Sequence, residues 1–347
     1  MSTNNLPTTI ESVKQLEDVL SRPAPGVIQT MARVPGDLIV LGVGGKTGPS
    51  LARMARRASD EAGVRRRVIG VSRFSNRALR DLLEDVGIET IACDLLDRRQ
   101  LDSLPDAPNV LYLAAMKFGS TGQEPMTWAM NAYLPGLVAE KYASSRFVSY
   151  STGNVYRMMP ADSGGSVETD APGPVGDYAM SCLGRERILT HFSQSRVMPT
   201  ALVRLNYAHE MRYGIMVDIA QQVLAGQPVD LTMGYFNAIW QGDSNAMTLG
   251  ALEHVASPPF IVNVAGPETL SVREIAEQFG ARFGKPVQFT GSESPDAFLS
   301  NPSKAVGLFG PPSVSVAQMI VWIADWLERG GPTHGKPTHF QTRDGQF

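Results

Sequence analysis

The stretch VLGVGGKTG at residues 40–48 combines closely spaced glycines with a lysine, a combination suited to holding phosphate groups. A nucleoside-triphosphate loop has the pattern GxxxxGK[ST], and its first glycine would fall on Val40, where the required backbone freedom is missing. A dinucleotide site needs glycines in a strand-to-helix turn, and Gly42, Gly45 and Gly48 supply the spacing GxxGxxG. The stretch therefore favours the pyrophosphate of a dinucleotide, with a plain glycine-rich turn as the alternative and a triphosphatase as a more distant one.

The end of the next apolar segment indicates which dinucleotide would bind. Residues 67–73 read RVIGVSR, and Ser72 and Arg73 stand where an NAD site usually places an acid for the ribose 2′-hydroxyl. A hydroxyl and a guanidinium suit a 2′-phosphate instead, and Lys46 is expected to add positive charge on the same side. These residues favour NADP over NAD, unless Arg73 is only a solvated charge at the end of a strand.

Composition and charge narrow the class of partner. The chain has 347 residues, of which 43% are hydrophobic, enough for one large domain or two unequal ones. Its net charge of -3 gives no whole-molecule attraction to nucleic acid or anionic membranes, so we expect a small-molecule substrate and copies of the same chain. No apolar run could span a bilayer and no secretory signal pattern opens the chain, which predicts a cytoplasmic location. The two cysteines and five histidines lack metal-ligand spacing, so no bound metal is expected.

Apolar segments and helix-length segments alternate along most of the chain. We expect strands at residues 37–42, 67–73, 89–94, 109–115, 146–152, 200–207 and 260–266. Helices are expected between them at residues 49–62, 76–86, 125–143, 177–193 and 214–225. Continuous apolar strands separated by helices predict an α/β fold, a doubly wound parallel sheet covered by helices on both faces.

Short motifs follow one another in a fixed order along residues 37–330: the three glycines, CDLLD, LYLAA, STGNVY, Tyr178, RLNYA and QGDSNA. In this order they resemble the extended branch of the short-chain dehydrogenase/reductases, the NAD(P)-dependent sugar epimerase/dehydratase family. The resemblance implies a seven-stranded Rossmann-type sheet with a smaller C-terminal substrate-binding lobe. It also implies coenzyme contacts from Gly42, Gly45, Lys46, Thr47, Gly48, Ser72, Arg73, Asp94, Leu95, Ala114, Ala115, Asn131, Ser151, Tyr178 and Asn206.

The element pattern and the resemblance together divide the chain into three parts. Residues 1–36 are expected to form a helical N-terminal extension, and residues 37–207 with about 241–270 the dinucleotide-binding Rossmann domain. Residues of about 208–240 and 271–347 would form the substrate-binding lobe and a tail. The tail has the composition of a disordered segment unless a substrate pocket or a partner subunit holds it.

In the resembled family a Ser or Thr orients the substrate oxygen, a Tyr transfers the proton, and a Lys four residues later lowers the tyrosine pKa. Thr152 and Tyr178 match the first two roles, but YAMSC places Cys182 at the lysine position. Without a nearby cation only about one tyrosine in 10³ is ionised at pH 7, which costs a general base up to about 4 kcal/mol. Carbonyl reduction uses the neutral phenol, so the change favours reduction over alcohol oxidation. Cys182 is a candidate nucleophile, although a small packing residue is the simpler interpretation.

Another cation could replace the missing lysine. Lys117 follows the fourth strand in AAMKFG, and the resemblance implies that this loop lies beside the nicotinamide and the substrate. Arg185 lies on the same helical face as Tyr178. We expect Lys117 to take this catalytic role and to contact the substrate, with a solvated lysine at a strand end as the alternative.

Absent arginines constrain the substrate. Family members that act on nucleotide sugars hold the diphosphate with an arginine where this chain has Phe236, and a second arginine is missing from residues 290–296. We therefore expect a small sugar, a sugar acid or a related polar carbonyl or hydroxyl compound. Its expected contacts are Lys117, Asn154, His209, Arg212 and Trp240.

Two functions follow as hypotheses. The first is an NAD(P)-dependent oxidoreductase or epimerase that transfers a hydride and uses Tyr178 as proton donor or acceptor. The second is a catalytically degenerate NADP(H)-binding sensor or scaffold protein, which Cys182 suggests. The resemblance also implies a homodimer formed through the helices at 125–143 and 177–193.

Overall fold

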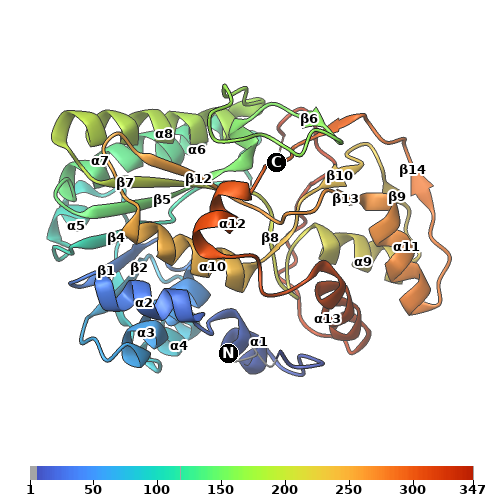
Figure 1. Ribbon diagram of the computed structural model, residues 1–347, viewed down its shortest axis with the longest axis horizontal. Coiled ribbons are helices and arrows are strands. Elements are labelled where there is room, and N and C mark those ends of the chain that lie inside the picture. The colour runs from blue at the N-terminus through green and yellow to red at the C-terminus, as the bar shows by residue number, and fades with distance from the viewer. Residues whose placement is uncertain (1–5, 118, 347) are drawn as a thin grey trace.

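The computed structural model describes residues 6–117 and 119–346, so the outermost ends of the predicted extension and tail, residues 1–5 and 347, lie outside the described residues. Seven parallel strands form one sheet in the order β12-β7-β5-β4-β1-β2-β3 (Figure 1). The strands are β1 (Leu38–Leu41), β2 (Val68–Ser72), β3 (Glu89–Ala92), β4 (Asn109–Tyr112), β5 (Arg146–Thr152), β7 (Thr200–Leu205) and β12 (Phe260–Val264). The predicted doubly wound Rossmann-type fold is confirmed.

The strand order reverses at β1, and this reversal places the candidate site. Strand β1 pairs in parallel with β2 on one side and with β4 on the other. In open α/β sheets ligands bind in the crevice at the carboxyl ends of the strands, at such a reversal. The loops that follow β1 and β4 therefore border the expected binding crevice.

Helices cover both faces of the sheet, as the continuous burial of its central strands requires (Figure 1). One face packs against α2 (Pro25–Arg33), α3 (Gly48–Glu61) and α10 (Gln241–Gly250), the other against α7 (Leu134–Lys141) and α8 (Gly176–Arg196). Further helices of this part are α4 (Arg77–Glu84), α5 (Arg98–Ser103), α6 (Glu124–Trp128), the π-helix η1 (Ala129–Tyr133), and the short η2 (Gly153–Val155) and η3 (Ala251–Glu253). The single helix predicted at 125–143 is thus three consecutive pieces, α6, η1 and α7.

A second hydrophobic core lies beside the sheet and contains side chains of α9 (Ile215–Ala225), α11 (Val272–Phe283) and α13 (Val316–Glu328) (Figure 1). The side chains of Ser271 and Ser315 cap α11 and α13 by accepting hydrogen bonds from Glu274 N and Gln318 N. The remaining elements are α12 (Ser303–Phe309) and the two-residue strands β6 (Met159–Pro160), β8 (Ala208–His209), β9 (Val229–Asp230), β10 (Tyr235–Phe236), β11 (Ile239–Trp240), β13 (Leu270–Ser271), β14 (Phe289–Thr290) and β15 (Asp296–Ala297).

The N-terminal segment joins the two cores. Helix α1 (Val13–Leu20) buries Leu16 and Leu20 in the core of α9, α11 and α13, while α2 buries Val27 and Met31 against the sheet domain. Among the described residues, no helix is both long and apolar enough to cross a membrane.

The tail that follows α13 is tied to the body of the protein at several points. The backbone N–H and the hydroxyl of Thr338 both donate to Asp218 Oδ2, at 2.7 and 2.6 Å. The Arg343 guanidinium pairs with Asp296 at 2.5 Å, and the Phe340 side chain is only 4% exposed within the second core. The disorder that composition suggested is therefore absent from the described part of the tail, because its one large aromatic side chain is buried.

Replacing Phe340 by Ala should lower the free energy of unfolding by about 3–5 kcal/mol, the usual cost of removing a buried phenylalanine side chain. Chemical denaturation of the full chain measures this loss. Leu308→Ala, at a side chain that is 44% exposed, is the control and should cost less than about 1 kcal/mol. Equal effects of the two substitutions would show that the tail is not packed as described.

Candidate functional site

The glycine-rich loop between β1 and α3 has three glycines with different constraints. Gly42 has φ +90°, and a Cβ there would lie 2.7 Å from the backbone N of Ala114. A Cβ on Gly48 would overlap the carbonyl of Val43, so this glycine allows α3 to approach the strand. A Cβ on Gly45 would meet only Gly42 O, at 3.4 Å. The fold itself requires the first and third glycines, whereas Gly45 leaves an open backbone surface beside the N-terminus of α3, where an anion is favoured.

The carboxyl end of β2 lies against this loop. A Cβ on Gly44 would overlap the Ser72 hydroxyl, so the loop backbone and the Ser72 side chain are in close contact. Arg73 follows and is exposed. No acid stands at the end of this strand, as the sequence indicated.

Lys46 points away from Arg73. Its ammonium group donates to the carbonyl oxygen of Ala208 at 2.6 Å and lies 4.2 Å from the centre of the Tyr213 ring. Both partners belong to the segment after β7, on the side of β1 opposite to β2. This contradicts the expectation that Lys46 adds its charge beside Arg73, because a long side chain in this loop can cross the crevice.

Tyr178 and Thr152 are brought together. Thr152 ends β5, Tyr178 lies in the first turn of α8, and their side chains are hydrogen-bonded. Burial raises the pKa of Tyr178 well above its usual value, and Cys182 adds to the rise, while the charge of Arg185 and the Thr152 hydroxyl oppose it. The Thr152 hydroxyl also donates to Asn154 Oδ1 at 3.1 Å. Tyr178 is therefore a neutral phenol at physiological pH.

Cys182 occupies the position one helical turn beyond Tyr178. Its side chain is 1% exposed and packs with Val155 and Tyr156, and burial raises the pKa of its thiol. The thiol is therefore neutral, which fits a packing residue, since a nucleophilic cysteine needs a lowered pKa.

Arg185 is a buried cation that braces the helices beside the site. Its guanidinium donates to Tyr150 O at 2.8 Å and to Asn131 Oδ1 at 3.0 Å. Asn131, in the π-helix η1, also exchanges hydrogen bonds with the backbone N–H and carbonyl of Met116, at 2.8 and 2.9 Å. Asn131, which was expected to contact the coenzyme, thus holds the loop that carries Lys117. Its position in a π-helix is notable because π-helical turns often occur at functional sites.

Lys117 lies beside the candidate proton donor. Its ammonium nitrogen is 5.8 Å from the ring centre of Tyr178 and 5.9 Å from that of Tyr207. Burial lowers the pKa of Lys117 to about 8, and the carboxylate of Asp218 opposes this. Lys117 is half-buried, so the alternative interpretation as a fully solvated lysine does not fit.

A buried polar network that the sequence analysis missed lies behind Thr152. Arg204 Nη2 pairs with Glu186 Oε2 at 2.6 Å, and both side chains are 4% exposed. The Ser151 hydroxyl, expected to contact the coenzyme, donates to Glu186 Oε1 at 2.6 Å, and Arg204 also donates to the Tyr156 hydroxyl at 2.6 Å. Glu186 could have been found from its spacing, because it lies two turns after Tyr178 on one face of α8.

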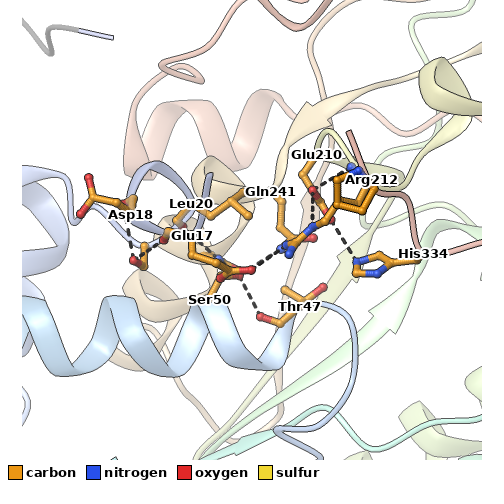
Figure 2. Close-up of polar contacts among 12 residues, drawn as sticks. Glu17, Asp18, Leu20, Thr47, Ser50, Glu210, Arg212, Gln241 and His334 are labelled. Carbon is orange, nitrogen blue, oxygen red and sulfur yellow. Dashed lines mark hydrogen bonds and ion pairs between the residues drawn. The ribbon is translucent and has the colours of Figure 1, made fainter. Parts of the chain in front are cut away.

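Arg212 belongs to a polar cluster that ties three distant segments together. It donates to Glu17 of α1 at 2.7 Å and to Glu210 at 3.1 Å, and His334 of the tail lies 3.2 Å from Glu210 (Figure 2). Arg212, which was expected to contact the substrate, is therefore paired with two carboxylates of the protein itself.

His209 and Trp240 are core side chains. His209 is fully buried, its Nδ1 lies 2.6 Å from Tyr207 O, and burial lowers its pKa to about 3, so the ring is neutral. Trp240 is 2% exposed, with its ring centre 5.3 Å from that of Trp322. Neither side chain lies with Tyr178, because His209 packs against Phe236 and Trp240 against Trp322.

The other expected coenzyme residues line the carboxyl edge of the sheet or the loops beyond it. Thr47 is the N-cap residue of α3, and Asp94 accepts a hydrogen bond from Leu96 N at 3.1 Å. Leu95 and Ala114 are 7% and 8% exposed, whereas Ala115 is exposed. The Asn206 amide donates to Phe298 O at 3.2 Å, toward the second core.

No family model matches the sequence, and a search of curated proteins finds no match. Solved structures do match. UDP-glucuronic acid 4-epimerase from Bacillus cereus, in complex with UDP-glucuronic acid and NAD, aligns with a TM-score of 0.70 at 19% identity, over 84% of this chain and 99% of that chain. UDP-glucose 4-epimerase from Thermotoga maritima gives 0.68 at 17% identity over 85% and 99%, and a putative epimerase from Burkholderia cenocepacia 0.68 at 19% over 86% and 99%. At this identity the likeness shows the shared fold.

Proposed function

We propose that this chain is an NAD(P)-dependent oxidoreductase or epimerase that transfers a hydride to or from a small polar carbonyl or hydroxyl compound. One observation carries the proposal: the Tyr178 phenol, hydrogen-bonded to Thr152, stands at the same edge of the parallel sheet as the glycine loop. A proton donor and a pyrophosphate turn at one edge are the two parts that such a reaction needs. The solved epimerases of the same fold, some bound to NAD, support this proposal.

The residues of the crevice fit a dinucleotide. Gly45 leaves room for a phosphate at the N-terminus of α3, and Gly42 has the positive φ of a tight turn. Ser72 and the exposed Arg73 end β2 without an acid, which favours NADP, with NAD as the alternative. When bound, the nicotinamide supplies or accepts the hydride.

The protein's own part in the reaction is to orient the substrate oxygen and to move one proton. Thr152 and Tyr178 would hydrogen-bond that oxygen, and the raised pKa of Tyr178 keeps its proton in place for donation. This favours carbonyl reduction, whereas alcohol oxidation would first have to ionise a buried phenol. Lys117, at 5.8 Å from the ring centre, is the cation that would stabilise the phenolate after proton transfer.

The proposed substrate is small and not a nucleotide sugar. Phe236, at the position where an arginine would bind a diphosphate, is 1% exposed and packed in the second core. Two of the solved epimerases are in complex with UDP-glucuronic acid or UDP-glucose, so UDP-glucose belongs in any substrate panel.

Replacing Gly45 by Ala should weaken NADPH binding at least tenfold, which is about 1.4 kcal/mol, because the added methyl group occupies the surface that would approach the pyrophosphate. The free energy of unfolding should change by less than about 1 kcal/mol, since Gly45 has no positive φ and its Cβ would meet no side chain. Fluorescence titration with NADPH and chemical denaturation measure the two effects. Gly307→Ala, with no atom near its Cβ, is the control. An unchanged NADPH affinity in Gly45→Ala would show that the pyrophosphate does not bind at this turn.

Replacing Tyr178 by Phe should reduce kcat for NADPH-dependent carbonyl reduction by at least about 100-fold, the lower range for loss of a general acid. NADPH affinity should stay within about threefold. The assay follows NADPH absorbance with a panel of aldoses, uronates, ketoses and UDP-glucose, and Tyr235→Phe is the control. Full activity in Tyr178→Phe would exclude this residue as the proton donor. Tight NADPH binding by the wild type without turnover of any panel member would favour the sensor or scaffold alternative.

We also infer a homodimer formed through α6, η1 and α8. These three elements contact one another and present large exposed apolar side chains: Met126 is 46%, Tyr133 60% and Met180 47% exposed. Contiguous exposed apolar side chains of this size mark protein interfaces. The family resemblance implies a second copy of the chain as the partner on this face.

Light scattering after gel filtration should give twice the chain mass for the wild type and the single-chain mass for the double variant Tyr133→Ser, Met180→Asp. The charge would be desolvated at the interface, which costs several kcal/mol. Leu82→Ser, at a side chain 58% exposed on α4, should stay dimeric. A wild-type protein that is monomeric at micromolar concentration contradicts the inference.

A further inference from the structure

The tail that follows α13 passes from the second core to α8, the helix that carries Tyr178. Its first part is fixed to the second core, because Thr338 donates twice to Asp218 of α9 and Phe340 is buried among the side chains of that core. Its last part lies against the sheet domain, where α8 begins. The tail therefore bridges the two parts of the protein.

The contact of the tail with α8 is made by two glycines. A Cβ on Gly345 would overlap the carbonyl oxygen of Val175, and a Cβ on Gly176 would overlap the backbone of Gly345. Both glycines have positive φ, +77° at Gly345 and +79° at Gly176. Any other residue at either position would push the two backbones apart, so the sequence specifically permits this close approach.

Both ends of the segment 338–345 adjoin the proposed catalytic groups. At one end, Asp218 lies close enough to Lys117 that the charge of each shifts the pKa of the other. At the other end, Gly345 lies against the start of α8, two residues before Tyr178. Since the Lys117 ammonium nitrogen is 5.8 Å from the Tyr178 ring centre, both ends of the segment border one small region of the crevice.

This region is nearly closed to solvent. Tyr178 is 9% exposed and Thr152 is 7% exposed. In the proposed function both side chains hydrogen-bond the substrate oxygen, so a substrate has to reach groups that are buried here. Part of their cover must therefore move when a substrate enters.

We propose that residues 341–346 form a lid over the substrate end of the crevice. Phe340 is the fixed point of the lid, and the contact of Gly345 with Gly176 is its closed position. The proposal takes the site around Tyr178 from the proposed function and adds how a substrate reaches it.

Few contacts hold the lid closed. All six of its residues are polar or glycine, so it has no apolar side chain to bury. Its ion pair, Arg343 with Asp296 at 2.5 Å, joins side chains that are 24% and 38% exposed, and pairs of this kind stabilise little. Segments with few buried apolar contacts open at a low free energy, and such segments commonly serve as active-site lids. The lid can therefore open while Phe340 stays in the second core.

Gly345→Ala should hold the lid open, because the added methyl group would overlap Val175. Gly335→Ala is the matched control, since Gly335 lies in the same tail with φ +61° but has no atom within 4 Å of its Cβ position. Both substitutions impose backbone strain, and only the first breaks the contact with α8. Arg343→Gln, which removes the ion pair, is a second opening variant that leaves the buried part of the tail intact.

Two measurements on the full chain, without coenzyme or substrate, test the lid. Limited trypsin digestion should cleave after Arg343 at least tenfold faster in Gly345→Ala than in the wild type or in Gly335→Ala. Acetylation by acetic anhydride at pH 8, followed by peptide mass spectrometry, measures the access of a small reagent to Lys117. Relative to the exposed Lys304, its rate should rise at least fivefold in Gly345→Ala and two- to fivefold in Arg343→Gln.

Faster tryptic cleavage without faster acetylation of Lys117 would show that the tail opens but covers nothing, which would overturn the proposal. Equal rates in Gly345→Ala and Gly335→Ala would overturn it too, since backbone strain alone would explain them. If circular dichroism shows that Gly345→Ala is unfolded, Arg343→Gln decides, and an unchanged Lys117 rate there contradicts the lid. The labelling needs no coenzyme, so a failed NADPH titration refutes the proposed function without affecting this test.

Discussion

Parallel hydrogen bonding of β1 with β2 and β4 is the constraint on which the whole site depends. It places the carboxyl ends of these strands, and of β5 and β7 beyond them, at one edge of the sheet. The glycine loop, Lys117 and Thr152 therefore meet although they are far apart in the sequence. An antiparallel neighbour would send one of these loops to the opposite edge, and the crevice would lose either the proposed phosphate turn or the proposed proton donor.

Buried ionic groups fix the second half of the site. The pair Glu186–Arg204 is almost fully removed from water, a cost that is offset only when further hydrogen bonds complete the geometry. Ser151 and Tyr156 supply these bonds, and they join α8 to β5 and the loop that follows it. The helix that carries Tyr178 therefore has little freedom to rotate relative to Thr152. A proton donor held in one position loses less entropy when a substrate binds.

Local signals were enough to predict the sheet, the glycine turn and the Tyr178–Thr152 pair. Each depends on residues close in sequence or on a strand pattern: apolar runs predict buried parallel strands, and positive φ at Gly42 follows from a tight turn. The π-helix at η1 was missed because nothing in its composition separates it from an ordinary helix. Within η1, the Asn131 side chain hydrogen-bonds the backbone of Met116, a contact between loops that the local sequence does not reveal.

Long-range contacts explain where the sequence interpretation failed. Arg212 has the chemistry of a substrate contact, but its partner Glu17 becomes a neighbour only when α1 packs against the second core (Figure 2). The direction of the Lys46 side chain and the order of the tail were missed for the same reason, since each depends on a partner more than a hundred residues away. Side-chain type predicts which groups can bind, whereas the tertiary fold decides which of them are still available.

Cys182 changes how the site must handle charge. A lysine at this position would accompany Tyr178 on one rigid helix, whereas a neutral thiol leaves the phenol protonated in the resting protein. Lys117 approaches from the loop after β4, which Asn131 holds at Met116, so the cation comes from a different element than the tyrosine. In the reductive direction the phenol becomes negative only as its proton leaves, and a nearby ammonium group is most valuable at that moment. A cation placed beside a neutral donor thus stabilises the product of proton transfer more than its starting state, which is the arrangement that the proposed reduction requires.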